Sequence, residues 1–255
     1  MNFLITGDTH GDFSRFNELD HDIYPPEDTV IIILGDAGVN FFLNERDVRL
    51  KKTIHSMGYQ FYLVRGNHEM RPEDMKGLRF VWSDLVVHGP VLQEREYENI
   101  HYLLDGETYY FLDSTVLVVG GGYSVDKFYR IAKNGYSPCD VERMDPDSAM
   151  KLTFWNPREQ LDREEQLDII ADVRDRHYNL VLTHTCPISI EPTDLFLDII
   201  DQNSVDKSTE QFLEELKNMI TFDHWMFGHY HADRIINDKF SMFFQGIYNL
   251  KDLIC

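Results

Sequence analysis

Basic residues are scarce in this sequence of 255 residues, which has 24 lysines and arginines against 44 aspartates and glutamates. The formal net charge of −20 argues against extended nucleic-acid binding or attachment to an anionic membrane, because both need a positively charged face. The three cysteines are widely spaced and odd in number, which indicates neither a disulfide framework nor a thiolate zinc site. We therefore expect a reducing, cytoplasmic location.

Long apolar segments and sequence repeats are also missing. No stretch approaches the roughly 18 apolar residues of a membrane span, and the first residues lack the basic region of a secretory signal. We expect a soluble, unexported protein with no membrane partner. The length allows a large core but is short for two domains, so we predict one domain over residues 1–255.

What is present is an alternation of apolar runs and amphipathic segments. Five runs rich in β-branched and aromatic residues are typical of buried strands: Asn2–Thr6, Thr29–Leu34, Gln60–Val64, Asn179–Thr183 and Phe222–Phe227. Helical periodicity appears between them, in Asn44–Ser56, Arg158–Arg176 and Thr209–Met219. This alternation predicts an α/β fold, with Val86–Gly120 as a candidate second sheet. Residues 132–156 and 189–208 lack periodicity, and we expect them to form loops or cap insertions.

A polar cluster follows each of the five predicted strands. The side chains in these clusters that can bind metal are Asp8, His10, Asp36, Asn67, His184, His229 and His231. In open α/β sheets, ligands bind at the carboxyl ends of the strands, so these clusters are expected to meet in one crevice. Each cluster by itself is common as a turn, a helix cap or a surface pair. Their joint occurrence after strands favours a shared site.

The donor types in these clusters predict the kind of metal. Two carboxylates, one amide oxygen and four imidazoles suit manganese, iron, zinc, nickel or cobalt, and they disfavour copper(I), magnesium and calcium. Glycines stand beside the donors, as tight turns at strand ends require. The sequence therefore predicts a site for divalent transition metal ions.

The order of these motifs resembles the calcineurin-like metallophosphoesterase superfamily, whose pattern is Asp-x-His, Gly-Asp, Gly-Asn-His-Glu/Asp, His and Gly-His-x-His. The resemblance covers nearly the whole chain. It implies a fold of two mixed β-sheets packed face to face and flanked by helices. It also implies two metal ions, the first bound by Asp8, His10, Asp36 and His231, and the second by Asp36, Asn67, His184 and His229.

The resemblance further implies a phosphoric ester hydrolase in which a hydroxide held between the two metals attacks a phosphate-ester substrate. His68 matches the family's histidine that contacts the substrate, as a general acid or a transition-state stabiliser. The alternative is that His68 only fixes its loop by hydrogen bonding. Glu69 is expected to brace the same loop.

Two positions separate the chain from the protein serine/threonine phosphatases. That group extends the second motif to Gly-Asp-x-x-Asp-Arg-Gly, whereas here Val39 and Asn40 replace the second aspartate and the phosphate-binding arginine. Residues 120–130 and 154–160 are instead similar to a group of small bacterial and phage-type metallophosphoesterases. We expect substrate recognition to be built differently from that of the protein phosphatases.

Substrate contacts are predicted from the segment after the glycine turn at residues 120–122. Lys127 and Arg130, three residues apart on a predicted helix, either meet phosphate oxygens or face solvent. Tyr123 and Trp155 either stack on the substrate or pack in the core. The other histidines, His21, His55, His88, His101, His177 and His224, are expected to be structural.

Three functions remain open at this point. A phosphoesterase is favoured, with monoesters ahead of diesters because Arg65–Glu69 resembles the third motif of the protein phosphatases. A metal-dependent nuclease would need a basic track that this acidic chain lacks. A non-catalytic metal-binding scaffold would have no need of His68.

Overall fold

The computed structural model describes residues 1–84, 86–149, 152 and 155–254. Its strands form two mixed sheets. The first has seven strands in the order β13-β1-β2-β3-β6-β5-β4, in which β1, β2, β3 and β6 run parallel. Its strands are β1 (Asn2–Thr6), β2 (Thr29–Ile33), β3 (Gln60–Leu63), β4 (Arg79–Ser83), β5 (Gly89–Gln93), β6 (Ile100–Leu103) and β13 (Tyr248–Asn249).

The second sheet has six strands in the order β11-β12-β10-β9-β8-β7. Strands β12, β10, β9 and β8 are parallel, and an antiparallel strand closes each edge. The strands are β7 (Thr108–Phe111), β8 (Ser114–Val119), β9 (His177–Thr183), β10 (Thr221–Phe227), β11 (Arg234–Ile235) and β12 (Phe240–Met242).

The main hydrophobic core lies between the two sheets. Because successive strand residues point to opposite faces, Phe3 and Ile5 of β1 enter this core together with Val116 and Val118 of β8. The alternate residue Leu4 packs instead on the outer face of the first sheet. Each fully buried aliphatic or aromatic side chain contributes roughly 1.5–3 kcal/mol, so the alternation fixes how the two sheets face each other.

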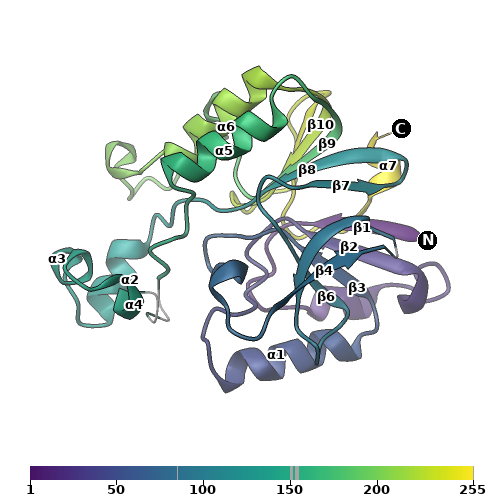
Figure 1. Ribbon diagram of the computed structural model, residues 1–255, viewed down its shortest axis with the longest axis horizontal. Coiled ribbons are helices and arrows are strands. Elements are labelled where there is room, and N and C mark those ends of the chain that lie inside the picture. Colours follow the sequence, from purple (N-terminus) through teal and green to yellow (C-terminus); the bar gives the residue numbers. More distant parts are fainter. Residues whose placement is uncertain (85, 150–151, 153–154, 255) are drawn as a thin grey trace.

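Helices cover both outer faces (Figure 1). Helix α1 (Glu45–Ser56) buries Ile54 against the first sheet, while α5 (Arg163–Val173) and α6 (Ser208–Met219) pack on the second. Helix α7 (Leu250–Ile254) follows β13. The prediction of an α/β fold with two mixed, face-to-face sheets flanked by helices is confirmed.

The distribution of strands differs from the sequence expectation in two respects. Strands β1, β2 and β3 belong to the first sheet, but β9 and β10 belong to the second, so the five polar clusters follow strands of two sheets. Residues 86–120 supply strands to both sheets rather than a separate one. Contacts across the core, which local patterns do not encode, determine this division.

Helix α5 begins five residues later than predicted. Asp162 accepts a hydrogen bond from the backbone N–H of Glu165, and the Glu165 side chain accepts one from the N–H of Asp162. This capping box fixes the start of the helix. Arg158, which was expected inside the helix, instead pairs with Asp74 and Glu165.

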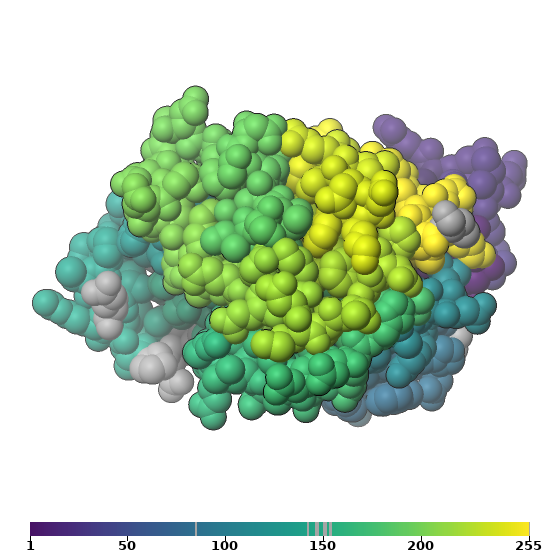
Figure 2. All heavy atoms as spheres, turned by 90° about the horizontal axis from the view of Figure 1, so that it is seen from above, coloured from purple at the N-terminus to yellow at the C-terminus, as the bar shows by residue number. Residues whose placement is uncertain are grey.

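The two stretches predicted as cap insertions contain short helical elements. The first lies around α2 (Lys127–Lys133), α3 (Pro138–Glu142) and α4 (Pro146–Ala149), and its residues 150, 151, 153 and 154 lie outside the described part of the chain. The second contains single turns at Ile188–Ile190, Thr193–Leu195 and Gln202–Ser204. Both lie at the same end of the molecule (Figures 1 and 2). No helix among the described residues is long and apolar enough to cross a membrane.

His101 makes stability dependent on pH. Its ring is 3% exposed, stacks on Tyr62 at 4.3 Å between centroids and bonds Gln60 Oε1 at 3.0 Å. Burial lowers its pKa from 6.5 to about 4. Below about pH 6.5 the unfolded chain therefore binds a proton that the folded chain excludes, and the free energy of unfolding falls as the pH drops.

Between about pH 7 and about pH 4, we predict that the free energy of unfolding falls by about 3 kcal/mol more in the wild type than in His101→Gln. Urea unfolding at both pH values measures this loss for each protein. His88→Gln, at an exposed position, is the control for removing an imidazole. An equal loss in the wild type and in His101→Gln would contradict the assignment.

Candidate metal centre and active site

The loops that follow β1, β2, β3, β9 and β10 meet where the parallel strands of both sheets end. Backbone bonds join them: His10 N–H donates to Asp36 O at 2.8 Å, and Gly228 N–H donates to His184 O at 2.9 Å. The segment after β12 joins as well, since Gly7 N–H donates to Phe244 O at 3.2 Å. The seven predicted donors therefore lie in one place, although they span residues 8–231 of the sequence.

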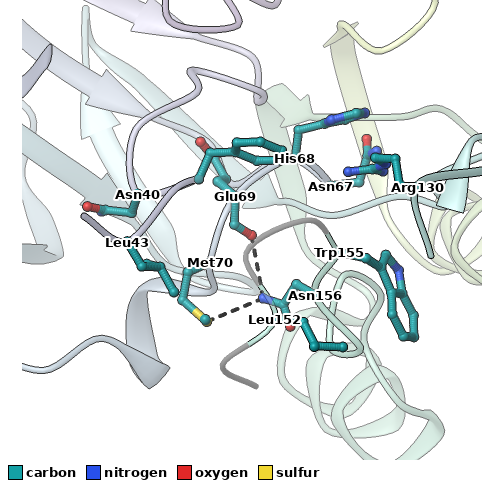
Figure 3. A pocket seen from close by; sticks show the side chains of 11 residues that line it. Asn40, Leu43, Asn67, His68, Glu69, Met70, Arg130, Leu152, Trp155 and Asn156 are labelled. Atoms are coloured by element: carbon teal, nitrogen blue, oxygen red, sulfur yellow. Dashed lines mark hydrogen bonds between the residues drawn. The ribbon is translucent and has the colours of Figure 1, made fainter. Parts of the chain in front are cut away.

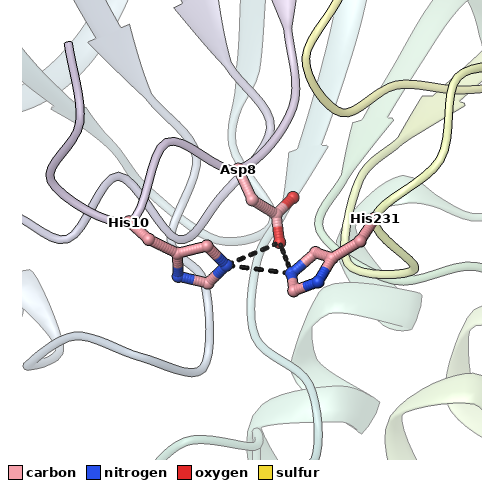
Figure 4. Close-up of side chains that lie close together, drawn as sticks. All are labelled: Asp8, His10 and His231. Atoms are coloured by element: carbon pink, nitrogen blue, oxygen red, sulfur yellow. Dashed lines mark hydrogen bonds and ion pairs between the residues drawn. The ribbon is translucent and has the colours of Figure 1, made fainter. Parts of the chain in front are cut away.

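The first group of donors contains Asp8, His10 and His231 (Figure 4). Nε2 of His10 and Nε2 of His231 lie 2.9 Å apart, and they lie 3.8 and 3.3 Å from Asp8 Oδ2. The His231 ring stacks on Phe244, with centroids 4.7 Å apart. Asp8 is buried, while both histidines are exposed, so this group opens to solvent.

The second group contains Asn67, His184 and His229. Nε2 of His184 lies 2.8 Å from Asn67 Oδ1 and 3.2 Å from His229 Nδ1. Asn67 is oriented by its amide, which donates to Ser124 Oγ at 2.8 Å. His184 is fully buried, so this group forms the inner part of the site.

Asp36 lies between the two groups and offers one oxygen to each. Its Oδ1 is 3.6 Å from His184 Nε2, and its Oδ2 is 4.0 Å from His10 Nδ1. Oδ1 also accepts the backbone N–H of His68 at 2.7 Å, which fixes the plane of the carboxylate. In the same way, Asp8 Oδ1 accepts the N–H of His229 at 2.9 Å.

The backbone at the site is held in an uncommon conformation. His10, Asp36, His229 and His231 have φ values of 47°, 48°, 68° and 52°, in the left-handed region that residues other than glycine seldom adopt. Such strain costs of the order of 1–3 kcal/mol per residue and persists where surrounding structure imposes it. The loops are therefore shaped for the placement of these side chains rather than for local stability.

The glycines beside the donors are needed for close approach. A β-carbon at Gly66 would collide with Asp36 Oδ1 and with the Asp36 backbone, and one at Gly35 would collide with the His184 ring. The sequence expectation that these glycines serve tight turns holds for Gly35, whose φ is +91°. At Gly66 the requirement is space for the Asp36 carboxylate.

Electrostatics distinguishes the buried donors from the exposed ones. Burial lowers the pKa of His229 to about 3, so its imidazole is neutral and presents a lone pair. The pKa of His231 is raised by its contact with the Asp8 carboxylate. Burial acts to raise the pKa of Asp36, but the neighbouring histidines, His184 first, outweigh it and lower the pKa. Asp36 is thus a carboxylate that can bind a cation.

The hydrogen-bond partners of His184 in the second group also favour a bound cation. In the neutral form that binds a metal, the His184 imidazole carries a single N–H, and Nδ1 donates it to the Leu34 carbonyl oxygen at 2.8 Å. Its Nε2 therefore directs a lone pair at Asn67 Oδ1, which is also an acceptor. Two acceptors at this distance repel each other unless a positive charge lies near both.

Comparison with known proteins identifies a family for this chain. The family model described as calcineurin-like phosphoesterase matches residues 1–233. This chain belongs to the calcineurin-like phosphoesterase family. It is a metal-dependent phosphoesterase that hydrolyses phosphoric esters, as the sequence resemblance predicted.

Two further searches add little. One similar solved structure is a phosphopantetheinyl hydrolase from Mycobacterium tuberculosis, at 11% identity and a TM-score of 0.41, covering 94% of this chain and 87% of that one. A search of curated protein sequences gives no match.

His68 of this phosphoesterase faces a small cavity beside the site (Figure 3). Its Nε2 lies 4.0 Å from Asp36 Oδ2, and Phe41 stacks on its ring with centroids 6.1 Å apart. Burial lowers the pKa of His68. Glu69 Oε1 accepts the N–H of Gly66 at 2.8 Å, the expected brace, and burial raises the Glu69 pKa to about 8.

The predicted substrate residues lie at different places around the centre. Arg130 lines the small cavity with His68 and Asn67 (Figure 3), and its guanidinium also pairs with Asp126 at 2.8 Å. Lys127 Nζ instead lies over the Tyr123 ring, 4.2 Å from the centroid. Tyr123 is buried, and Trp155 is half-buried at the edge of the small cavity. Phe154, which belongs to the phage-type motif, lies outside the described residues.

Sequence reasoning missed the residues that support the glycine turn at 120–122. Arg65 is buried and donates to Asp105 Oδ2 at 2.8 and 2.9 Å, and to the Glu159 carbonyl at 2.7 Å. Glu159 in turn accepts the N–H of Ser124 at 3.2 Å. The only signal in the sequence was that Arg65 stands before Gly66, as in a phosphatase motif. In this structure, Arg65 holds the glycine turn at 120–122 in place.

Asn40, at the position of the phosphatase arginine, also has a structural environment. It is buried, donates to Tyr102 Oη at 2.9 Å and accepts from Lys51 Nζ at 3.0 Å. Lys51 pairs with Glu94 at 2.7 Å. In this phosphoesterase the position therefore belongs to a buried polar network that reaches the wall of the small cavity beside His68.

We predict that Gly66→Ala abolishes stoichiometric metal binding, because the new methyl group displaces the Asp36 carboxylate. Elemental analysis after manganese loading and desalting measures the ion content. Gly77→Ala is the control, since Gly77 has a φ of +93° but open space around it, so the substitution strains the backbone without touching the site. Full metal content in a folded Gly66→Ala protein would contradict the proposed packing.

Proposed function

We propose that this phosphoesterase hydrolyses phosphate monoesters in preference to diesters, with two divalent transition metal ions at the centre. The position of Asp36 is the observation that carries the proposal. One of its oxygens faces His10 and the other faces His184, which supports a carboxylate shared by two ions. Manganese, iron, zinc, nickel and cobalt all suit the mixed oxygen and nitrogen donors.

Each ion has its own residues in this proposal. The outer group, Asp8, His10 and His231, and the inner group, Asn67, His184 and His229, each share Asp36. Two ions bound there supply positive charge to the phosphate and acidity to the attacking water. The protein contributes fixed donor positions, since Leu34 orients His184 and backbone N–H groups orient both carboxylates.

The substrate phosphate is placed against His68 in this scheme. Its ring reaches the small cavity next to Asp36, from where a ring N–H can donate to a phosphate or leaving oxygen. We assign His68 the role of general acid or transition-state stabiliser.

Arg130 supports the preference for monoesters. A monoester carries one more negative charge than a diester at neutral pH, and Arg130 adds a cation to the wall of the cavity that His68 lines. Lys127 and Tyr123 lie together earlier in the same segment, with the Lys127 ammonium over the Tyr123 ring. In this proposal they contact the leaving group rather than the phosphate.

A single catalytic domain in the cytoplasm stays our prediction for the organisation and location of the chain. Cys186 is buried and unpaired, and Cys139 is exposed and unpaired, which suits a reducing compartment.

We predict that the manganese-loaded enzyme has a higher kcat/KM for p-nitrophenyl phosphate than for bis(p-nitrophenyl) phosphate. Arg130→Gln should lower this ratio by about tenfold, because it removes a charge-assisted contact to the dianion. Lys133→Gln, an exposed neighbour on α2, is the matched control. A higher rate on the diester would overturn the monoester preference, and no turnover of either ester would overturn the proposed function.

We predict that His68→Gln lowers kcat by roughly 10²- to 10⁴-fold while the bound metal stays unchanged. Glutamine keeps a polar side chain of similar length in the loop, so a purely structural role would leave kcat close to that of the wild type. His88→Gln controls for the loss of an exposed imidazole elsewhere. Equal kcat values in His68→Gln and wild type would remove His68 from the chemistry.

A further inference from the structure

A second, largely apolar cavity of about 230 Å³ opens directly beside the metal centre. His229 and His231, both assigned to metal binding above, form part of its wall. Much of the remaining wall comes from residues 195–207, which belong to the segment 189–208 that showed no periodicity in the sequence. A phosphate bound at the metals would therefore have this cavity next to it.

The walls of the cavity suit a ring. Tyr123, Phe196 and Tyr230 contribute aromatic faces, and Ile200 and Val205 add branched aliphatic groups. Phe196 and Tyr230 lie nearly parallel, with centroids 6.4 Å apart and an interplanar angle of 23°. Removing an apolar ring from water into such surroundings is favourable at roughly 25 cal/mol per Å².

One end of the cavity is polar and incompletely satisfied. Glu210 lines the cavity and is 3% exposed. Its Oε1 accepts from Thr185 Oγ1 at 2.8 Å, but its Oε2 is buried without a hydrogen-bond partner among the described residues. Burial raises the Glu210 pKa to about 7. A buried acceptor without a partner is costly, and a ligand that donates a hydrogen bond would remove that cost.

The nearby lysine does not fill this role. Lys207 Nζ binds Glu191 Oε1 at 2.5 Å and lies 4.5 Å from the centroid of the Phe196 ring. Glu191 and Glu210 thus face a single ammonium group. The balance of charge at this end of the cavity favours a donor or a cation over another acceptor.

A rival cavity on the other side of the centre lacks this feature. It has a volume of about 310 Å³ and is lined by His10, His68, Phe42 and Asp47, among others. Both Asp47 oxygens already accept backbone N–H groups, from Phe42 at 3.2 Å and from Leu43 at 2.6 Å. The Asp47 carboxylate is therefore satisfied without a ligand, unlike that of Glu210.

Resting on the phosphoesterase function proposed above, we propose that the cavity beside His229 and His231 binds the leaving group of the substrate. That leaving group is an alcohol with an apolar ring and, at its far end, an N–H or O–H that donates to Glu210 Oε2. The volume is below the 300–1,000 Å³ typical of drug-sized sites, so it holds one ring with short substituents.

The first arm of the test compares benzyl phosphate with methyl phosphate, whose leaving alcohols have similar acidity. The wild-type enzyme with manganese prefers benzyl phosphate in kcat/KM, and Ile200→Ser lowers this preference by about tenfold, through KM. Ile199→Ser is the matched control, because Ile199 is 89% exposed and is absent from the cavity wall. Phe42 lines the rival cavity, so Phe42→Ser tests whether that cavity sets the preference for benzyl phosphate.

The second arm tests the donor. The wild type prefers 4-(aminomethyl)benzyl phosphate to 4-ethylbenzyl phosphate, which has the same shape but no donor. In Glu210→Gln the amide oxygen stays with Thr185 and the amide nitrogen replaces the free acceptor, so the preference falls to parity or reverses. An unchanged preference in Glu210→Gln would overturn the assignment of Glu210.

Binding of benzylphosphonate and methylphosphonate, which are not hydrolysed, separates the cavity from the chemistry. Calorimetry with metal-loaded protein should show about tenfold tighter binding of benzylphosphonate, a difference lost in Ile200→Ser and kept in Ile199→Ser. Equal affinities in the wild type, or a difference lost only in Phe42→Ser, would overturn the inference. Tight, Ile200-dependent binding without turnover of any ester would instead keep the cavity and overturn the proposed function.

Discussion

Two carboxylates, each about 1% exposed, lie where the parallel strands of two sheets end, and the rest of the site depends on compensating their charge. In the part of the chain that the structure describes, the ion pairs of Asp8 and Asp36 involve histidines and neither lysine nor arginine. An isolated buried carboxylate is costly unless it is paired, hydrogen-bonded or bound to a metal. The surrounding imidazole lone pairs point to metal ions as the missing partners.

The strained loops follow from the same requirement. The left-handed backbone at His10, Asp36, His229 and His231 lowers the stability of the fold. Burial of apolar side chains between the two sheets offsets this cost. The gain is a set of donors held in place before any ion arrives. Gly66 illustrates the tightness of this arrangement, since a single added carbon atom would occupy the space of the Asp36 carboxylate.

Much of this arrangement is predictable from sequence because strands and their ends are local features. Apolar runs such as Asn2–Thr6 give the strands, and the polar cluster after each run gives the candidate donors. The assignment of β9 and β10 to a second sheet was not predictable, because it depends on which faces pack together. Arg65 was also misleading, since its partner Asp105 lies 40 residues away and no local pattern connects them.

The metal centre and the segments around it have different roles, the first in the reaction and the second in the choice of substrate. Rigid strand ends position the residues for the reaction, as is common when loops sit on a stable sheet. Residues from Leu195 to Lys207 line the cavity beside His229 and His231, and Arg130, Trp155 and Asn156 line the small cavity beside His68. Most of these wall residues belong to segments 132–156 and 189–208, which have no regular periodicity that would reveal their shape in advance. Substrate choice therefore depends on the part of the chain that is hardest to interpret from sequence.

The most direct test of the account is a crystal structure of the manganese-loaded protein with anomalous scattering data. Two manganese peaks that share Asp36 are expected, one beside Asp8, His10 and His231 and the other beside Asn67, His184 and His229. A single peak, or peaks away from Asp36, would contradict the shared carboxylate on which the proposed function depends.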